Sequence, residues 1–281
     1  MLALFARAWN RWFAEPLRRV EADSLAFRQS DRGRRFDGKT VTVVLVAAVT
    51  LTLQNYFGNP AAVIPVLKWV AAVSGDPTAA DDAAAVLAEW HATQTARLTW
   101  FALSAFTLYA VVPGLVVVLA FRERLTEYGV GVRGVAADWP VYLLFAAVMV
   151  PLVYLCSEFP RFQDVYPFYR VGSADDVGRG FVRWELVYAL QFVGLEFFFR
   201  GFLVHGTKHR FGAYSVFLMV IPYCMIHYHK PSAECFGSIL AGVGLGVVSL
   251  VTRSVWPGAG LHILVAWGMD LSVLARRGML F

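Results

Sequence analysis

The chain has 281 residues, of which 58% are hydrophobic and 16% are charged, and its mean hydropathy is +0.56. Soluble domains carry more charge, so this composition excludes an ordinary soluble enzyme and indicates a polytopic membrane protein. Most of the formal net charge of +5 comes from residues 1–39. This charge indicates anionic membrane lipid as a partner, and the basic residues carry no nucleic-acid-binding motif.

The N-terminal segment, residues 1–39, is basic and partly amphipathic. Apolar and aromatic residues recur there at helical spacing, while Arg7 and Arg11 fall on the opposite face. This pattern predicts a helix in the headgroup region that Pro16 interrupts early, although a solvated basic tail is an alternative. The positive-inside rule then places the N-terminus in the cytoplasm, as expected for an integral protein of the cell (inner) membrane.

Residues 40–281 alternate apolar stretches with polar links and predict an all-α transmembrane bundle of about seven helices. The expected spans are 41–57, 98–121, 139–157, 186–204, 211–226, 235–252 and 261–275. Residues 60–73 are expected to be re-entrant or interfacial, and the acidic link 76–89 is expected on the far side of the membrane. The aromatic stretch 158–183 is interpreted as an interfacial loop or lid, or else as a linker. Seven full spans would leave the C-terminal arginines outside, so the count could be one too high.

Several small or polar residues have open interpretations. Gly242 and Gly246, four residues apart, either allow close helix approach or are ordinary small residues in a crowded bundle. His205 and His209 lie among basic residues and are expected at the cytoplasmic edge. The cysteines lack the short paired spacing of a zinc site or disulfide framework and are expected to be buried thiols. They are Cys156, Cys224 and Cys235.

The stretch 184–206, WELVYALQFVGLEFFFRGFLVHG, carries two charges in the middle of an apolar helix. Each would cost about 2.5 to 3.5 kcal/mol at the centre of a membrane helix, so both must face the protein interior. Glu196 and Arg200 are four residues apart on one helix face and are expected to form an ion pair. The pair is either a structural brace or part of a functional site.

Two histidines accompany later apolar segments, His227 in YCMIH and His262 in LHILVAWGMD. With Glu196 they would come from three separate helices and converge in the bundle interior, where such a set can activate water. An interfacial position is the alternative for His227, because it lies beside His229 and Lys230.

These residues resemble the motifs of the CPBP family of intramembrane proteases, which includes the CAAX prenyl proteases and the bacteriocin-processing, Abi-like group. LEFFFRGFL is similar to the first motif, Glu-Glu-x-x-x-Arg, from Glu196 onward. YCMIH is similar to the second, Phe-x-x-x-His, and His262 matches the start of the third, His-x-x-x-Asn or Asp. The resemblance covers about residues 139–274 and implies the catalytic residues Glu196, Arg200, His227 and His262.

Two positions depart from the family pattern. Leu195 stands where the family has its first Glu, which is thought to activate water. Ala266 stands where it has Asn or Asp, which is thought to stabilise the oxyanion, and Asp270 is expected to be a structural acid instead. Consecutive helical residues point about 100° apart, so Glu196 cannot simply replace the missing Glu. Either the helix is rotated or locally distorted, or the water-activating step is lost.

The residues that are present allow two mechanisms. Without a metal, Glu196 or His227 takes a proton from water and His262 donates a hydrogen bond to the developing oxyanion. Arg200 then orients Glu196. With a divalent metal such as zinc, Glu196 and the two histidines would form the ligand set of a catalytic site.

The predicted function is therefore that of a CPBP-family intramembrane endopeptidase. It would hydrolyse a peptide bond in a membrane-associated peptide or protein, with a prenylated C-terminus as the substrate that the family implies. The alternative is a noncatalytic family member that binds hydrophobic segments, an interpretation favoured by Leu195 and Ala266.

The distribution of arginine generates a topological prediction. A cysteine introduced beside Arg34 is expected to react with a membrane-impermeant maleimide only after the cells are opened. A cysteine introduced beside Asp82 is expected to react in intact cells. Labelling of the first position from outside would contradict the assignment.

Overall fold

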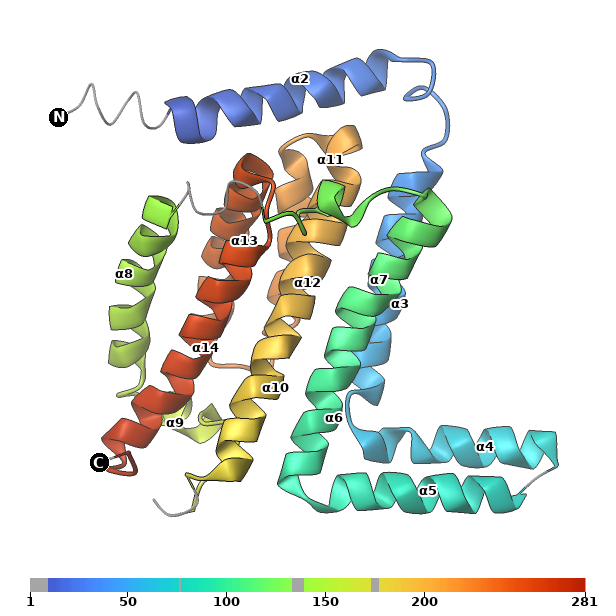
Figure 1. The fold of residues 1–281 in the computed structure, drawn as a ribbon, viewed down its shortest axis with the longest axis vertical. Helices are drawn as coiled ribbons and strands as arrows, with labels where there is room; N and C mark the ends of the chain where they lie inside the picture. Colours follow the sequence, from blue (N-terminus) through green and yellow to red (C-terminus); the bar gives the residue numbers. More distant parts are fainter. Residues whose placement is uncertain (1–9, 76, 133–138, 173–176, 281) are drawn as a thin grey trace. The chain divides into compact units, whose positions relative to one another are not determined.

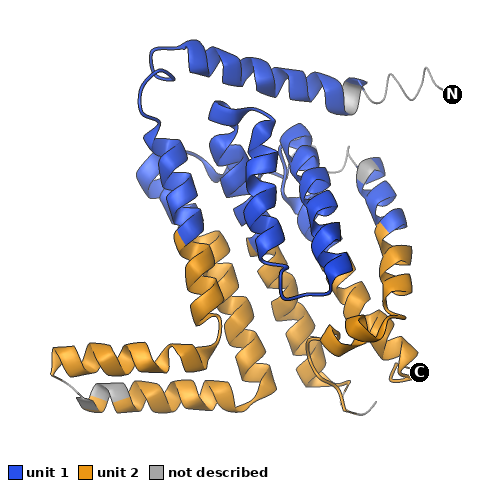
Figure 2. Cartoon of the chain, turned by 180° about the vertical axis from the view of Figure 1, so that it is seen from behind, with its two compact units in different colours: residues 1–48, 112–148, 195–262 blue, residues 49–111, 149–194, 263–281 orange. Residues whose placement is uncertain are grey.

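The computed structural model describes residues 10–75, 77–132, 139–172 and 177–280, and within these ranges it contains helices and no strand. The chain forms two compact units (Figure 2). Unit 1 comprises residues 1–48, 112–148 and 195–262, and unit 2 comprises residues 49–111, 149–194 and 263–281. The predicted fold class, a helical membrane bundle, is confirmed.

Five helices are long and apolar enough to cross a membrane. They are α3 (Gly38–Phe57), the helix Gln94–Phe121, the helix Arg179–Phe211, α13 (Ser232–Thr252) and α14 (Trp256–Arg276). The shorter apolar helices are Pro60–Ser74, Tyr142–Cys156 and Tyr214–Met225. All seven predicted spans are helical, but those at 139–157 and 211–226 belong to the shorter group. The count of seven therefore stays a prediction.

Two of the long helices are built from several pieces. The helix Gln94–Phe121 comprises α6 (Gln94–Phe106), the π-helix η3 (Thr107–Val111), α7 (Val112–Leu115) and the π-helix η4 (Val116–Phe121). The helix Arg179–Phe211 comprises α10 (Arg179–Glu196), the π-helix η8 (Phe197–His205) and α11 (Gly206–Phe211). The second helix carries the two charges found in the sequence, and its π-helical piece begins directly after Glu196.

In unit 1, helix α2 (Glu15–Gln29) lies across the ends of α11 and α13 (Figure 1). The Ser24 hydroxyl donates a hydrogen bond to the Arg210 carbonyl at 3.1 Å. The Glu21 carboxylate accepts one from the Ala213 backbone N–H at 2.6 Å, where α12 (Tyr214–Met225) begins. Because a helix N-terminus attracts negative charge, Glu21 fixes α2 to the bundle electrostatically as well as by packing.

The expected break at Pro16 is wrong. The π-helix η1 (Asn10–Ala14) leads directly into α2, and Pro16 lies in the first turn of α2. A proline is tolerated there because the first backbone N–H groups of a helix have no intrahelical partner. Phe5 and Trp9, two of the aromatic residues of the predicted amphipathic helix, lie outside the described residues.

Acidic side chains of unit 1 fix the start of α3 beside the 3₁₀-helix η5 (Leu125–Tyr128). Burial raises the pKa of the Asp37 carboxyl, but hydrogen bonds from Thr40 outweigh this effect and hold the pKa below its usual value. The pKa of Glu123 is likewise lowered against the effect of burial by its ion pair with Lys39, at 2.7 Å, and by the Tyr128 hydroxyl. Both carboxyl groups therefore stay ionised at neutral pH.

Helices α12 and α13 approach closely at the two glycines. A Cβ atom on Gly242 would lie 3.0 Å from the Tyr223 ring, and one on Gly246 would lie 2.7 Å from Val216. This packing decides between the two interpretations of the glycines in favour of close approach. Helix α12 has 12 residues, or about 18 Å of rise, against about 30 Å for the apolar core of a bilayer. Its C-terminal end can therefore lie at membrane depth.

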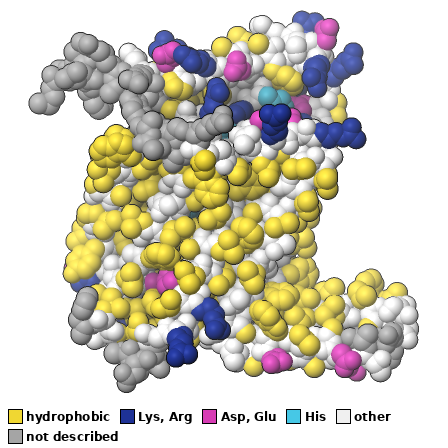
Figure 3. All heavy atoms as spheres, viewed as in Figure 1, with side chains coloured by type: hydrophobic (Ala, Val, Ile, Leu, Met, Phe, Trp, Pro, Cys, Tyr) yellow, Lys and Arg dark blue, Asp and Glu magenta, His cyan; other side chains and the backbone are white. Residues whose placement is uncertain are grey.

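Large apolar side chains face outward from the spans. Leu45 of α3, Leu119 of η4 and Leu240 of α13 are 59%, 68% and 77% exposed. On the face drawn in Figure 3, hydrophobic side chains are widespread, and Lys and Arg gather over α2. Contiguous apolar surface of this kind is typical of contact with lipid, so the chain is an integral membrane protein.

In unit 2, the 3₁₀-helix η2 (Pro60–Ala62) precedes α4 (Ile64–Ser74), which packs beside α5 (Pro77–Ala92) (Figure 1). The expected acidic link at 76–89 is thus mostly a helix. Its alanine-rich sequence explains this difference, because alanine has the highest helix propensity.

The segment after α8 (Trp139–Cys156) is a packed part of unit 2 and not merely a linker. It includes the short helix α9 (Pro160–Val165), and its Phe162 and Tyr166 pack against Val273 of α14. Its end is tied to α6 by hydrogen bonds between Gln94 and Arg170.

Two acids, Glu185 of α10 and Asp270 of α14, are buried against each other in unit 2. They are 9% and 0% exposed, and their carboxyl groups interact directly. The Phe168 backbone N–H donates to Asp270 Oδ1 at 3.4 Å, whereas neither Glu185 carboxyl oxygen accepts a hydrogen bond from a donor among the described residues. Two carboxylates in such a position repel each other unless they share a proton.

The substitution Glu185→Gln is therefore expected to stabilise the protein. It replaces one of two facing acceptors by a group that can donate a hydrogen bond to Asp270. Thermal unfolding of the purified protein at neutral pH should show a higher midpoint. Glu89→Gln, at an exposed position of α5, is the matched control and should leave the midpoint unchanged. A lower midpoint for Glu185→Gln would show that its negative charge is stabilising.

Candidate active site

The helix Arg179–Phe211 places Glu196 and Arg200 in the interior of unit 1. Both residues are 0% exposed, and Arg200 Nη1 lies 2.9 Å from Glu196 Oε1. Glu196 is the last residue of α10, and Arg200 lies within η8. The ion pair expected from the spacing is thus present. The helix is also locally distorted, which is one of the alternatives left open by the sequence.

His262 reaches the same carboxylate from α14. Its Nδ1 lies 2.9 Å from Glu196 Oε1, the oxygen that also pairs with Arg200. One carboxylate oxygen therefore binds two cationic or hydrogen-bonding partners from two helices. The other oxygen, Glu196 Oε2, is buried and accepts no hydrogen bond from the described residues.

Tyr223 of α12 is the common neighbour of the remaining site residues. The Arg200 guanidinium lies over its ring at 4.1 Å from the ring centre, a cation–π contact. Its ring centre lies 5.0 Å from that of His227 and 6.3 Å from that of His262. Tyr223 thus separates and aligns the two histidines, so the second motif contributes its aromatic residue as well as its histidine.

The position of His227 fixes the tautomer of its neutral ring. His227 is 7% exposed and lies just after α12. Its Nδ1 is 2.8 Å from the Tyr223 carbonyl oxygen. A carbonyl oxygen only accepts, so Nδ1 carries the proton and donates. The neutral imidazole therefore presents an unprotonated Nε2, the form that acts as a base. The side chain of His227 is thus buried in protein, whereas its neighbour His229 is exposed.

Gly258, at the start of α14, gives Glu196 the space that it occupies. A Cβ atom on Gly258 would lie 2.6 Å from Glu196 Oε2. By contrast, a Cβ atom on Gly260 would have no atom within 4 Å. Pro257 and Gly258 thus lie in the first turn of α14, and Gly258 is part of the wall around the carboxylate.

Some expected groupings are not found. No group of three or more His, Cys, Asp or Glu side chains is arranged to hold a metal ion anywhere in the described ranges, so Glu196 and the two histidines do not fit a zinc site as they stand. Ala266 and Asp270 belong to unit 2, where both are buried. Leu195 directly precedes Glu196 in the sequence, and its apolar side chain is buried, with 4% exposed.

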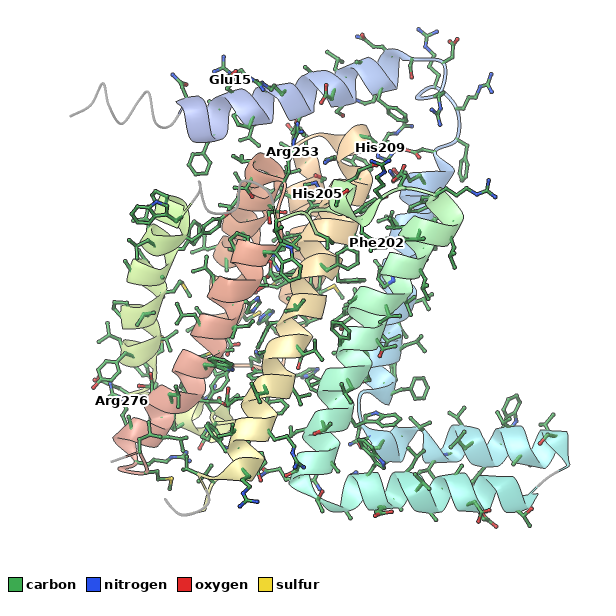
Figure 4. All side chains as sticks on the ribbon, viewed as in Figure 1. Glu15, Phe202, His205, His209, Arg253 and Arg276 are labelled. Carbon is green, nitrogen blue, oxygen red and sulfur yellow. The ribbon has the colours of Figure 1, made fainter. Side chains whose placement is uncertain are left out.

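The expected position of His205 at the cytoplasmic edge stays a prediction, but its side chain is buried. His205 is 3% exposed, and its ring nitrogens lie 3.1 Å from Ser249 Oγ and 2.7 Å from Lys208 Nζ. Figure 4 shows His205 and His209 near Arg253, in the part of unit 1 that α2 covers. The basic neighbours suggested a surface position, and no local signal in the sequence indicates that the helix turns His205 inward.

Breaking the Glu196–Arg200 pair is expected to destabilise the protein strongly. Glu196→Gln or Arg200→Leu leaves one buried charge without its partner, at a cost of about 3 to 5 kcal/mol. The double variant should lose less stability than the sum of the two single variants, measured by thermal unfolding in detergent.

The exposed pair Glu15–Arg19 has the same four-residue spacing and is the control. A double-mutant cycle on this pair should give a coupling near zero, because exposed ion pairs contribute little. Equal coupling at the two sites, or additive losses at the buried one, would contradict the buried pair.

The glycine wall gives a second prediction. Gly258→Ala should displace the Glu196 carboxylate and lower both stability and any activity of the site, because its Cβ would overlap Oε2. Gly260→Ala, two residues away in the same helix turn, should be neutral or slightly stabilising. Unfolding midpoints of the two variants make the comparison, and equal midpoints would contradict the close contact.

Comparison with known proteins supports the identity suggested by the motifs. Residues 179–268 match the model of the Rce1-like family, described as type II CAAX prenyl endopeptidase Rce1-like. No curated protein and no solved structure matches the chain. The matched segment runs from the start of α10 into α14 and contains the whole Glu196 site. Residues 179–268 are therefore similar to the Rce1-like family, which agrees with the resemblance to the CPBP family.

Proposed function

We propose that the protein is an intramembrane endopeptidase of the CPBP type. It hydrolyses a peptide bond of a membrane-associated peptide or protein, and a prenylated C-terminal peptide is the first substrate to test. The observation that carries this proposal is the convergence of Glu196, His262 and the Tyr223–His227 pair in an apolar interior, within the segment that matches the family. A merely structural brace would require only the Glu196–Arg200 pair.

His227 is the proposed general base. Its Nε2 has a free lone pair in the neutral ring, since Nδ1 donates to the Tyr223 carbonyl. A water molecule that donates a hydrogen bond to Glu196 Oε2 would attack the scissile carbonyl carbon, and its other proton would pass to His227 Nε2. The protonated ring would then give this proton to the leaving amine nitrogen.

His262 is the proposed oxyanion donor. The carboxylate of Glu196 accepts a hydrogen bond from His262 Nδ1, and in the doubly protonated ring the Nε2–H of His262 would donate to the developing oxyanion. Arg200, whose guanidinium lies over the Tyr223 ring, balances the charge of Glu196. This assignment uses Oε1 for orientation and leaves Oε2 for water, so it does not require the glutamate that Leu195 replaces.

A noncatalytic role is the second candidate. Leu195 and Ala266 remove two polar groups of the family pattern, and the buried site could bind a hydrophobic segment without cutting it. Binding an apolar segment would not require the polar contacts of Glu196 with Arg200 and His262, so these contacts favour the enzyme. The proposed mechanism uses no metal ion, because Glu196 and the two histidines do not form a metal-ligand group in the described residues.

The membrane setting is part of the proposal. The protein would lie in the cell (inner) membrane with lipid around its exposed leucines and with its N-terminus in the cytoplasm. Its substrate would enter from the lipid phase, as expected for a peptide that carries a lipid or a hydrophobic segment.

The test is a cleavage assay with purified protein in lipid nanodiscs and a fluorogenic, C-terminally farnesylated peptide. His227→Ala and His262→Ala are each expected to lower kcat/KM at least a hundredfold while the protein stays folded, because each removes a proton-transfer or oxyanion group. His229→Ala, at the exposed neighbouring position, is the matched control and should retain activity. A chelator should leave the rate unchanged, and inhibition that zinc reverses would replace the His227 mechanism with a metal mechanism.

Failure to cleave any lipidated peptide would favour the noncatalytic candidate. In that case the same peptide should still bind, and His262→Ala should weaken its binding. Restoring the family residues with Leu195→Glu and Ala266→Asn should then produce measurable hydrolysis. Equal cleavage by the wild type and by both histidine variants would contradict the proposed site.

A further inference from the structure

The cysteines at the junction of α12 and α13 lie side by side. Cys224, near the end of α12, and Cys235, in the first turn of α13, have their Sγ atoms 3.7 Å apart. The two helices pack against each other over their length and are joined by residues 226–231. Both thiols are free and half-buried. No sequence pattern indicates this pairing, because the two residues are eleven positions apart in different helices.

We propose that Cys224 and Cys235 are a redox modification site, at which a hydroperoxide converts the dithiol into a disulfide that controls the neighbouring His227. The regulatory part of this proposal rests on the proposed protease function. The formation of the disulfide does not.

The reaction balances with a hydroperoxide as the two-electron oxidant. One cysteine, as its thiolate, attacks the peroxide oxygen and becomes a sulfenic acid while water or an alcohol leaves. The second thiol then attacks the sulfenic sulfur, the S–O bond breaks and a second water leaves. Two thiol protons and two electrons are thereby transferred to the peroxide.

The geometry allows the bond after a small movement. The sulfur atoms must approach from 3.7 Å to about 2.0 Å, a shift of about 1.7 Å that side-chain rotation and slight closure of the helix pair can supply. The oxidant can reach the pair, because Met225 and Tyr228 at the hairpin end are 52% and 62% exposed. Thiols sealed in the core would not be available in this way.

The disulfide would act on the site through the hairpin. Cys224 follows Tyr223, and the residues enclosed between the two cysteines include His227. Tyr223 holds His227 through its carbonyl and contacts His262 and Arg200 through its ring. A displacement of about 1 Å in such a group can cost a hundredfold in rate. The oxidised protein should therefore cleave at least tenfold more slowly than the reduced protein, and dithiothreitol should restore the rate.

The chemical test uses the full chain in nanodiscs, treated with hydrogen peroxide, blocked with a maleimide and digested without reductant. Mass spectrometry should find one disulfide-linked pair of peptides containing Cys224 and Cys235, which is absent after reduction and absent in Cys224→Ser. Cys156→Ser, which changes the cysteine in unit 2, is the control and should leave the cross-link in place. Maleimide on both Cys224 and Cys235 after peroxide treatment would overturn the proposal, as would a cross-link that uses Cys156.

The functional test compares cleavage before and after peroxide treatment. Cys224→Ser and Cys235→Ser should keep the rate of the reduced wild type and should not respond to peroxide. Equal rates for the reduced and disulfide-bonded wild type would overturn the regulatory part. If the reduced protein cleaves nothing, the proposed function fails, while the peptide map still decides whether the disulfide forms.

Discussion

The rest of unit 1 depends on a buried pair of opposite charges in an apolar helix. Glu196 and Arg200 are both fully buried, and an isolated charge at such a position would be too costly to retain. Their neighbours are arranged to compensate this cost. Arg200 stacks on Tyr223, His262 donates to the carboxylate, and Gly258 leaves the space in which the second oxygen lies. The contacts of the site therefore compensate the cost of burying two charges, and the same contacts make the site a candidate for catalysis.

The same constraint separates what could be predicted from what could not. The apolar helices and the ion pair follow from local rules of helix period and length; the ion pair is found, and five of the helices are long and apolar enough to cross a membrane. The convergence of His262 on Glu196 also follows, since a polar group in an apolar helix needs a polar neighbour. What failed depends on tertiary contacts. Pro16 was expected to interrupt a helix, yet the helical segment continues through it, and the burial of His205 against Ser249 has no local signal.

Three features have no local signal at all. The π-helical geometry of η8 depends on how its side chains pack, and the facing acids Glu185 and Asp270 come from helices far apart in the sequence. The paired thiols likewise require the return of the chain through residues 226–231. The sequence predicts only part of the role of Tyr223. Its spacing to His227 indicates a motif, but its contacts with His262 and Arg200 depend on the fold.

The π-helix η8 also has a consequence for how this chain tolerates changes in length. Each π turn closes its hydrogen bonds over one residue more than an α turn, so the nine residues of η8 contain surplus length relative to an α-helix. A one-residue deletion within 197–205 can therefore be absorbed by converting one π turn to an α turn, whereas a deletion inside α10 would rotate everything after it by about 100°. The deletion in η8 would still change the angle between Glu196 and the residues that follow. The longer π turns thus rotate the residues that follow Glu196 about the helix axis, and this rotation sets the face that Arg200 presents to α12.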